Sequence, residues 1–356
     1  MAFRLSDLGE RRIIEEVLRP RYGRQGVPRF GDDCALVAPG DAVADGILVA
    51  TTDPCPEPVA NHLGYSDLYY RGWLLATINL SDLGAVGARP LGLLTSLILP
   101  NELTVSEFSR LLDGIDACCA ASGTRVIGGN IKEGRSIDLT ATAIGVCPGG
   151  ACMSRTGANV GDLIAVVGDL GLFWAGVLAA QRQAFPPGID REVLLRNVLT
   201  PMPKVSVGLT LAQNRLLTAC LDNSDGLYAS LTQLAEANHV EMHVNMDDAQ
   251  FSPEVLQVAS LLGVDPVRLA MGWGDWQLVG CVSPSRVDEV NRVAQLQGTS
   301  LFIIGNVRAG RGIVLSHGGH QEKMAAIDSQ RFTRESWFTS GLANYIESLV
   351  KGPLWG

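Results

Sequence analysis

The chain has 356 residues, of which 47% are hydrophobic and 18% charged, and its formal net charge is −9. This composition describes a compact globular protein long enough for two domains, and it excludes an intrinsically disordered one. The acidic balance argues against binding to nucleic acid or to an anionic membrane surface, because both attract basic proteins.

Predicted helices and strands alternate along the first part of the chain. Hydrophobic residues at helical spacing predict a helix over residues 6 to 19 and a longer one over residues 66 to 88. Thr104 and Glu107 have the spacing of a capping box, which predicts that a third helix begins there. Alternating patterns and buried apolar runs predict strands at residues 46–52, 92–100, 125–129 and 136–146.

The pattern begins again after residue 150, so we place a domain boundary there and expect domains at residues 1–150 and 151–356. In the second domain, helices are predicted at residues 172–181, 203–215 and 225–238, with a further helix between the last two strands. A strand with a glycine turn is predicted at residues 162–171, and further strands at 240–245, 276–282 and 300–305. Because both halves mix strands with helices, each domain is expected to be α/β or α+β.

The eight cysteines form no C-x-x-C pair and are too few for a disulfide scaffold. We therefore expect reduced, mostly buried thiols in a cytoplasmic protein. The N-terminal stretch carries charges where a signal peptide needs an apolar core. The most apolar long window, residues 162–181, is interrupted by Asp169, so no membrane-spanning helix is expected.

Two short patterns suggest sites that the surrounding sequence does not support. The stretch "GNIKEGRS" nearly matches a phosphate-binding loop, but Arg135 replaces the lysine and a strand pattern follows in place of the required helix. His239 and His243 could share one face of a helix and bind zinc, but the residues around them predict a strand. We reject both sites.

Acidic residues recur at the ends of apolar elements and are the strongest functional signal. They are Asp32, Asp33, Asp53, Asp82, Asp222 and Asp225. Each one alone is explained by a turn, a strand end or a helix cap; Asp222 or Ser224, for example, could cap the helix near residue 225. Asp82 differs, because it lies inside a mainly apolar helix, where an unpaired carboxylate is costly.

If several of these carboxylates converge, their repulsion needs a countercharge, and few lysines or arginines lie near them in the sequence. Mg²⁺ bound through oxygen ligands is the natural candidate. Clustered Mg²⁺ in an acidic enzyme indicates a nucleotide phosphate chain.

Seven motifs occur in one order: "GDDCALV", "LVATTD", "INLSDLGAVGARP", "VIGGN", "SRTGANVGDLIAVVGDLG", "PMPKVSVG" and "LDNSDGL". With these motifs the chain, from about residue 6 to residue 310, resembles thiamine-monophosphate kinase. That family belongs to the superfamily of aminoimidazole ribonucleotide synthetase, selenophosphate synthetase and the hydrogenase nitrile-forming maturation protein.

The resemblance implies a two-domain aminoimidazole ribonucleotide synthetase-like fold. An N-terminal α/β domain would dimerise through its sheet as a dimer barrel, and a C-terminal α+β domain would carry a terminal extension. ATP would lie across the homodimer, held by several Mg²⁺ ions.

The resemblance also implies which residues bind the metal and the nucleotide. The matching metal positions are Asp33, Thr51, Thr52, Asp53, Asp82, Asn130 and Asp222, with Asp225 near a metal. The matching ATP positions are Gly129, Asn130, Arg155 and Ser224. Arg155 would hold a phosphate through the planar fork of its guanidinium.

The match weakens where relatives bind the phosphate acceptor. Relatives continue from the Thr-Thr-Asp strand to "V-H-F", whereas this chain has "VAN", with Ala60 at the histidine position and His62 displaced by two. The second acceptor motif, usually "G-G-E-D-Y-E-L", is "GWGDWQL", with Trp273, Gly274 in place of the first glutamate, and a retained Asp275. The ATP half is therefore expected to be preserved and the acceptor half to be rebuilt.

Three functions remain open at this point. The leading hypothesis is an ATP- and Mg²⁺-dependent phosphotransferase that acts on thiamine monophosphate or on another small metabolite. The second is ATP-dependent activation of an amide or carbonyl oxygen, and the third is a non-catalytic nucleotide-binding dimer. No general base is evident, so we assign no catalytic residue.

Overall fold

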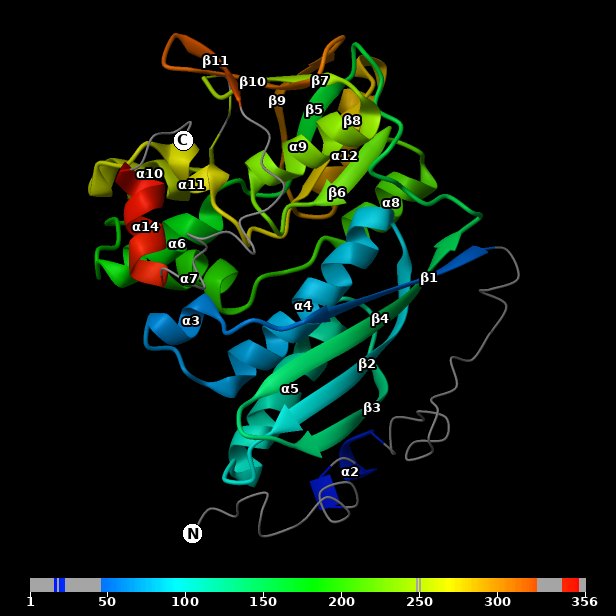
Figure 1. Ribbon diagram of the computed structural model, residues 1–356, viewed down its shortest axis with the longest axis vertical. Helices are drawn as coiled ribbons and strands as arrows, with labels where there is room; N and C mark the ends of the chain where they lie inside the picture. Colours follow the sequence, from blue (N-terminus) through cyan, green and yellow to red (C-terminus); the bar gives the residue numbers. More distant parts are fainter. Residues whose placement is uncertain are drawn as a thin grey trace. The chain divides into compact units, whose positions relative to one another are not determined.

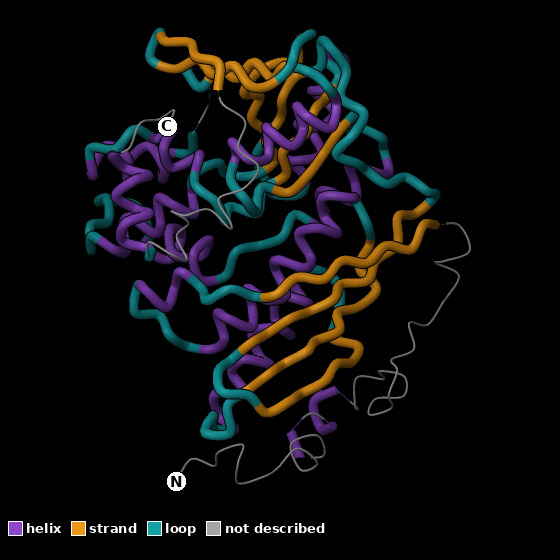
Figure 2. The backbone as a smooth tube through the Cα atoms, viewed as in Figure 1, coloured by secondary structure: helices purple, strands orange, loops and turns teal. Residues whose placement is uncertain are grey.

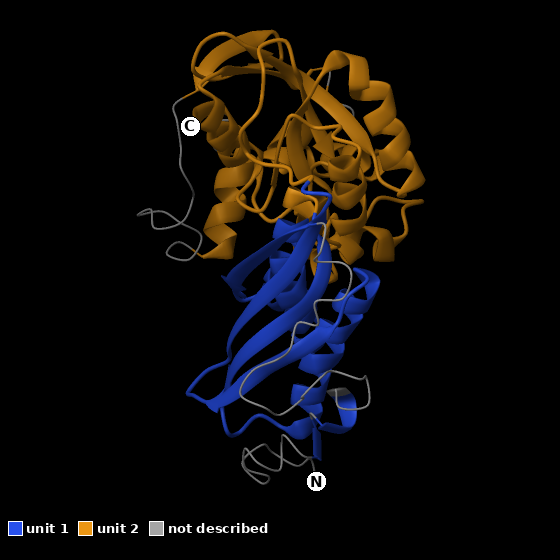
Figure 3. Cartoon of the chain, turned by 90° about the vertical axis from the view of Figure 1, so that its right-hand side faces the viewer, with its two compact units in different colours: residues 1–83, 88–150 blue, residues 84–87, 151–356 orange. Residues whose placement is uncertain are grey.

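The computed structural model describes residues 16–17, 19–22, 46–247, 249, 251–324 and 341–351. It divides into two compact units, of which the first contains residues 1–83 and 88–150, and the second residues 84–87 and 151–356 (Figure 3). Asp32, Asp33 and most of the helix predicted at residues 6–19 lie outside the described residues.

The first unit is a four-stranded sheet with helices on one face (Figures 1 and 2). The strand order is β1-β4-β2-β3, with β4 antiparallel to both β1 and β2, and β3 parallel to β2. The strands are β1 (Gly46–Pro54), β2 (Arg89–Leu99), β3 (Val126–Glu133) and β4 (Asp138–Pro148). The helices are α2 (Arg19–Tyr22), α3 (Val59–His62), α4 (Leu68–Val86) and α5 (Val105–Ala121).

Two glycines allow α4 and α5 to pack closely. A Cβ at Gly72 would lie 2.0 Å from the carbonyl oxygen of Leu111, and a Cβ at Gly114 would lie 1.9 Å from that of Tyr69. The capping box predicted at the start of α5 is confirmed, because the Thr104 and Glu107 side chains each bond to the other residue's backbone N–H. The close approach of the two glycines fixes α4 against α5.

The second unit is built on a seven-stranded sheet of order β11-β10-β7-β9-β5-β8-β6, in which only β7 and β10 pair in parallel. Its strands are β5 (Leu163–Val167), β6 (Ala219–Asp222), β7 (Glu241–Asn245), β8 (Leu278–Val282), β9 (Leu301–Arg308), β10 (Gly312–His317) and β11 (His320–Met324). Its helices are α6 (Leu172–Gln181), α7 (Arg191–Leu199), α8 (Val205–Gln213), α9 (Leu227–Asn238), α10 (Pro253–Leu262), α11 (Pro266–Met271), α12 (Val287–Leu296) and α14 (Leu342–Lys351).

Each face of this sheet has its own core. On one face, residues of β5, β7 and β10 pack against α9 and α11, with Met242 and Ile313 among the buried side chains. On the other face, residues of β5, β6 and β8 pack against α8 and α12, with Leu278 and Val290 buried there. Helices α6, α7, α10, α11 and α14 form a further packed group (Figure 1). The mixed helix and sheet content of both units confirms the predicted fold class.

The cysteines correct one expectation. Cys147 and Cys152 are in disulfide linkage, so the prediction of reduced thiols is wrong for these two residues. The free cysteines in the described part of the chain are Cys55, Cys118, Cys119, Cys220 and Cys281, and all are buried. No helix of the described residues is long and apolar enough to cross a membrane.

Candidate functional site

The end of β1 presents the Thr-Thr-Asp sequence to α4. Strand alternation directs Thr51 and Asp53, both half-buried, to one face, and leaves Thr52 exposed on the other. The Thr51 hydroxyl donates a hydrogen bond of 2.6 Å to the Oδ2 atom of Asp82 on α4. The structure therefore brings two predicted metal positions, from segments 31 residues apart, into direct contact.

Asn79 holds the backbone of Asp53 in place, and it is not among the residues predicted from the sequence. Its side chain is fully buried in α4, where it accepts a bond of 3.0 Å from the backbone N–H of Asp53 and donates one of 3.3 Å to the Asp53 carbonyl. Asn79 thus pairs with both backbone groups of an edge-strand residue, as a neighbouring strand would. It also lies three residues before Asp82, so both side chains project from one face of the helix. The sequence did offer one signal for Asn79, because a polar amide in a mainly apolar helix, three residues before Asp82, needs hydrogen-bond partners.

The donor set at this place suits Mg²⁺. Asp53 and Asp82 supply carboxylate oxygens and Thr51 supplies a hydroxyl, which are the hard oxygen ligands that Mg²⁺ prefers. The Thr52 hydroxyl, also a predicted metal position, faces the other side of the strand and donates to the Ala141 carbonyl at 2.8 Å. Within the described ranges, no group of three or more His, Cys, Asp or Glu side chains gathers as a complete metal site. Of the other predicted acidic ligands, Asp33 is not described, and Asp222 and Asp225 belong to the second unit.

Gly129 and Asn130 lie on β3, at the opposite edge of the sheet from β1. The strand register places Gly129 level with Thr95, Thr95 level with Ala141, and Ala141 level with Asp53. Three strand spacings separate the two edges, or about 14 Å, so Asn130 and Asp53 of one chain do not reach the same ion. A Cβ at Gly129 would lie 2.2 Å from the Thr95 carbonyl oxygen, which is why glycine is required there.

In the second unit, Arg155 is exposed on a loop that one asparagine holds. The Oδ1 atom of Asn238, the last residue of α9, accepts bonds from the backbone N–H groups of Gly157 (2.7 Å) and Ala158 (2.9 Å). Its Nδ2 atom donates to the Arg155 carbonyl at 2.9 Å. Asn238 therefore fixes the backbone that displays Arg155, and no motif in the sequence indicated this contact.

The loop that follows β6 excludes the alternative role considered for its polar residues. Neither Asp222 nor Ser224 caps α9, because the N-cap is Gly226. The Ser224 hydroxyl instead donates to the Oδ1 atom of Asp222 at 3.2 Å. The backbone N–H of Asn223 donates to the Gln277 carbonyl at 2.8 Å, so the loop is tied to the start of β8.

The stretch predicted to be the acceptor motif lies directly against this loop. The backbone N–H of Gly274 donates to the carbonyl of Ser224 at 2.9 Å, which joins a predicted acceptor position to a predicted ATP position. Gly274 has a φ of +82°, a conformation that favours glycine. Asp275 is only 5% exposed, and its Oδ2 atom accepts a bond of 2.9 Å from the backbone N–H of Gly171. Burial raises the pKa of Asp275 to about 7.

Lys204 supplies a positive charge near this buried carboxylate. Burial lowers the pKa of Lys204, while the charges of Asp169 and Asp275 act to raise it. The Ser300 hydroxyl donates to Asp169 at 3.1 Å, so both carboxyl groups are engaged by the surrounding structure. Lys204 belongs to the "PMPKVSVG" motif, for which the sequence alone indicated no role.

Aromatic side chains surround the acceptor motif. The Trp273 ring lies 5.5 Å from that of Trp174 in an edge-to-face arrangement and 5.8 Å from that of Tyr345. The Trp174 indole N–H also donates to the Trp273 carbonyl at 2.7 Å. Phe173 contacts the edge of Trp276, with ring centroids 6.0 Å apart. Trp273 therefore belongs to a rigid aromatic group contributed by α6, α14 and this loop, of which the sequence indicated only Trp273.

The other predicted acceptor positions, Ala60 and His62, lie on the short helix α3. Ala60 is completely buried, and its carbonyl accepts bonds from the backbone N–H groups of Leu63 and Tyr65. His62 is exposed at the end of the helix. Only His62 of this pair is accessible to a small molecule.

Comparisons with known proteins identify the family of the chain. Residues 31–147 match the N-terminal domain of AIR synthase related proteins, and residues 159–318 match their C-terminal domain. The chain is 32% identical to a thiamine-monophosphate kinase of Mycobacterium tuberculosis, over 78% of this chain and 81% of that protein.

Solved structures give the same result. The crystal structure of the thiamine-monophosphate kinase from Stenotrophomonas maltophilia is similar with a TM-score of 0.71 and 29% identity, over 85% of this chain and 96% of that one. A structure of AaThiL complexed with AMPPCP and TMP is similar with a TM-score of 0.67 and 26% identity, over 90% of this chain and 96% of that one.

Proposed function

The chain belongs to the family of AIR synthase related proteins as an ATP-dependent kinase of the thiamine-monophosphate kinase type, and we propose that its acceptor is a small phosphorylated metabolite bound beside a rebuilt, aromatic loop. Residues 1–150 would bind ATP and Mg²⁺ and form the dimer. Residues 151–356 would complete the nucleotide site and supply the acceptor loop.

Contacts within the first unit support the metal side of this proposal. Thr51 donates to Asp82, and Asn79 holds the backbone of Asp53, so the Asp82 carboxylate and the backbone that carries Asp53 are positioned before a ligand arrives. Bound Mg²⁺ would neutralise the charge of the nucleotide's phosphates. In the second unit, Asp222 and Asp225 would add acidic ligands, and Arg155 would hold a phosphate by its guanidinium fork.

The separation of about 14 Å between Asn130 and Asp53 supports a site shared by two protomers. We assign Gly129 and Asn130 to the nucleotide whose metals are held by Asp53 and Asp82 of the other protomer. A homodimer joined through the four-stranded sheet would bring the two edges together.

The observation that carries the acceptor proposal is the bond between Gly274 and Ser224. It supports a position of the altered motif beside the ATP that Ser224 would contact. Gly274 offers no carboxylate there, Ala60 is buried, and Trp273 is held in an aromatic group. In place of the functional groups that the resemblance assigns to the acceptor site, the chain would present an apolar aromatic surface.

The chemistry requires little of the protein beyond positioning and charge stabilisation. An acceptor that already carries a phosphate has an anionic oxygen able to attack, so it needs no general base. Asp275 is buried and bonded to Gly171, which makes it a support for the loop rather than an exposed base.

The test is the release of ADP from ATP and Mg²⁺ in the presence of thiamine monophosphate and of a panel of phosphorylated metabolites, with product masses measured. We expect a phosphorylated product with at least one panel member and weak turnover of thiamine monophosphate. Efficient turnover of thiamine monophosphate would refute the rebuilt acceptor site. ATP binding without turnover of any acceptor would refute the kinase and favour a nucleotide-binding dimer.

A further inference from the structure

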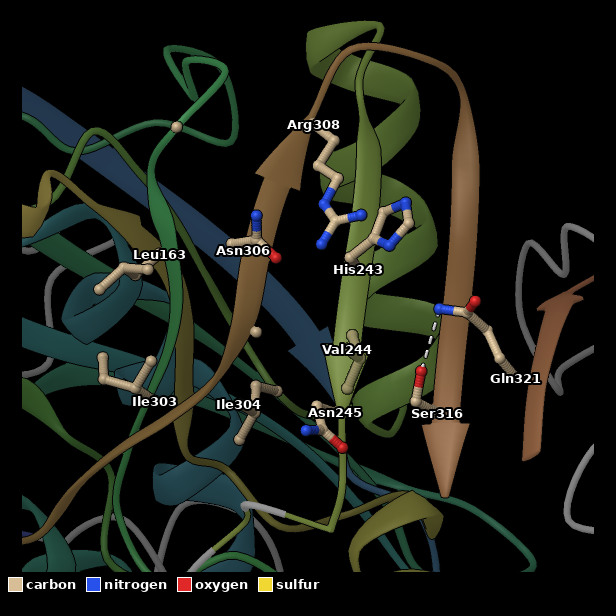
Figure 4. A pocket seen from close by; sticks show the side chains of 12 residues that line it. Leu163, His243, Val244, Asn245, Ile303, Ile304, Asn306, Arg308, Ser316 and Gln321 are labelled. Carbon is tan, nitrogen blue, oxygen red and sulfur yellow. Dashed lines mark hydrogen bonds between the residues drawn. The ribbon is translucent and has the colours of Figure 1, made fainter. Parts of the chain in front are cut away.

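A pocket of about 590 Å³ lies on one face of the seven-stranded sheet (Figure 4). Residues of β5, β7, β9, β10 and β11 line it, and none of them is a predicted metal, ATP or acceptor position. Its volume is within the range of pockets that bind small molecules.

Strand alternation explains why this face is polar. On β7, Met242 and Val244 point into the core that faces α9, while His243 and Asn245 point to the opposite side. On that opposite side the core under α8 and α12 includes residues of β5, β6, β8 and β9, but none of β7, β10 or β11. The helical layer therefore ends partway across the sheet, and polar side chains occupy the remainder.

The charges at the upper end of the pocket leave one cation available. Arg308 on β9 lies opposite Glu241 on β7, but the Glu241 carboxylate is already bonded to His243 (2.5 Å) and to Lys323 (2.9 Å). These bonds hold the pKa of Glu241 below its usual range, so the carboxylate remains ionised. Across the described part of the chain, no hydrogen bond or ion pair engages the Arg308 guanidinium.

Asn306 stands next to this cation. It pairs with His243 across the two strands, and Figure 4 shows its amide and the His243 ring on either side of the Arg308 guanidinium. No other described residue forms a hydrogen bond with the Asn306 side chain. Leu163 and Ile303 supply an apolar part of the lining, and Ser316 and Gln321, bonded at 3.2 Å, supply hydroxyl and amide groups farther along.

We propose that this pocket binds a small organic oxyanion, a metabolite that carries a carboxylate or a phosphate group. Arg308 holds the oxyanion through its guanidinium fork, which suits both groups. Asn306 donates a further hydrogen bond from its amide, and the remainder of the metabolite lies over Leu163 and Ile303 toward Ser316. Lys323 and Arg308 outnumber Glu241, so the local charge favours an anion.

The test is calorimetric titration of the full chain with citrate, inorganic phosphate and ribose 5-phosphate at low ionic strength. Citrate and the two phosphates distinguish the carboxylate source from the phosphate source. Arg308→Gln should weaken the affinity for the probe that binds about tenfold or more, because a hydrogen bond to a charged group is lost. The matched control is Arg311→Gln. Arg311 is an exposed arginine three residues farther along, on the connection between β9 and β10, and it does not line the pocket. It should leave affinity unchanged.

A second variant, Asn306→Leu, should also weaken binding, and circular dichroism checks that each variant is folded. Both pocket variants should keep the wild-type rate of ATP turnover, so failure of this proposal is distinguishable from failure of the kinase proposal. The proposal is overturned if no probe shows saturable binding, or if Arg311→Gln weakens binding as much as Arg308→Gln. It is also overturned if the bound probe is unaffected by Arg308→Gln, because that probe then occupies another site.

Discussion

Asn79→Leu tests whether a buried amide positions the Thr-Thr-Asp strand. The substitution keeps the side chain's approximate size but removes every hydrogen bond that it makes to Asp53. The backbone N–H and C=O of Asp53 then lose their partners on the side away from β4. Each unsatisfied group costs about 1–3 kcal/mol, and both are only partly buried, so we expect a loss of about 2–4 kcal/mol in the free energy of unfolding.

The functional consequence should be a raised Mg²⁺ requirement, because Asp53 is no longer held beside Asp82. Urea unfolding measures the stability, and ATP turnover as a function of Mg²⁺ concentration measures the positioning. The matched control is Thr77→Val, also fully buried in α4 but with its hydroxyl bonded to the Trp73 carbonyl and not to β1. It should retain wild-type Mg²⁺ dependence. If Asn79→Leu also retains both the wild-type stability and the wild-type Mg²⁺ dependence, Asn79 does not position Asp53.

Four further substitutions test the site. Asp82→Asn should abolish Mg²⁺-dependent ATP turnover while the circular dichroism spectrum is unchanged; retained turnover would remove Asp82 from the metal site. The pKa of Asp275 is about 7 in the folded protein, against an ordinary 3.8. The protonated carboxyl therefore stabilises the fold fully below about pH 4, and the free energy of unfolding falls by up to about 4 kcal/mol as the pH rises through 7. Unfolding of Asp275→Asn between pH 4 and 8 should lack this decline, and an identical pH profile in both proteins would contradict the assignment. Ala60→His should destabilise the protein by about 1–3 kcal/mol in thermal or urea unfolding, because Ala60 is completely buried; unchanged stability would show that α3 moves to accept the ring. Gly274→Glu should increase the turnover of thiamine monophosphate, and it should lower the free energy of unfolding by about 1 kcal/mol because the φ of this residue is +82°. If turnover does not increase, this position does not select the acceptor.

Several elements were predictable because their signals are local. The alternation over residues 136–146 corresponds to β4, and the capping box at Thr104 begins α5. The strand pattern around His243 is β7, and the rejected phosphate loop forms the end of β3 and the start of the connection to β4, without a helix. In each case the residues that form the signal lie within one element.

Elements with short or unusual patterns were missed. Strand β6 has only four residues and all are buried, so it shows no alternation. The sequence also predicted neither the hairpin of β10 and β11 nor the helices α7, α10, α11 and α14. The alternative that Asp222 or Ser224 caps α9 is excluded, because Gly226 is the N-cap and the Ser224 hydroxyl bonds to Asp222.

The sequence by itself determined the family, the two-domain mixed fold and the acidic motifs, since these depend on residue types and their order along the chain. Only the tertiary structure decided that Asn79 holds Asp53, that Asn238 holds the Arg155 loop, and that Gly274 bonds to Ser224. It also decided that Asn130 and Asp53 lie at opposite edges of one sheet. The reason is physical: periodicity and caps act over a few neighbouring residues, whereas a bond between distant residues exists only after strands choose their register and helices pack.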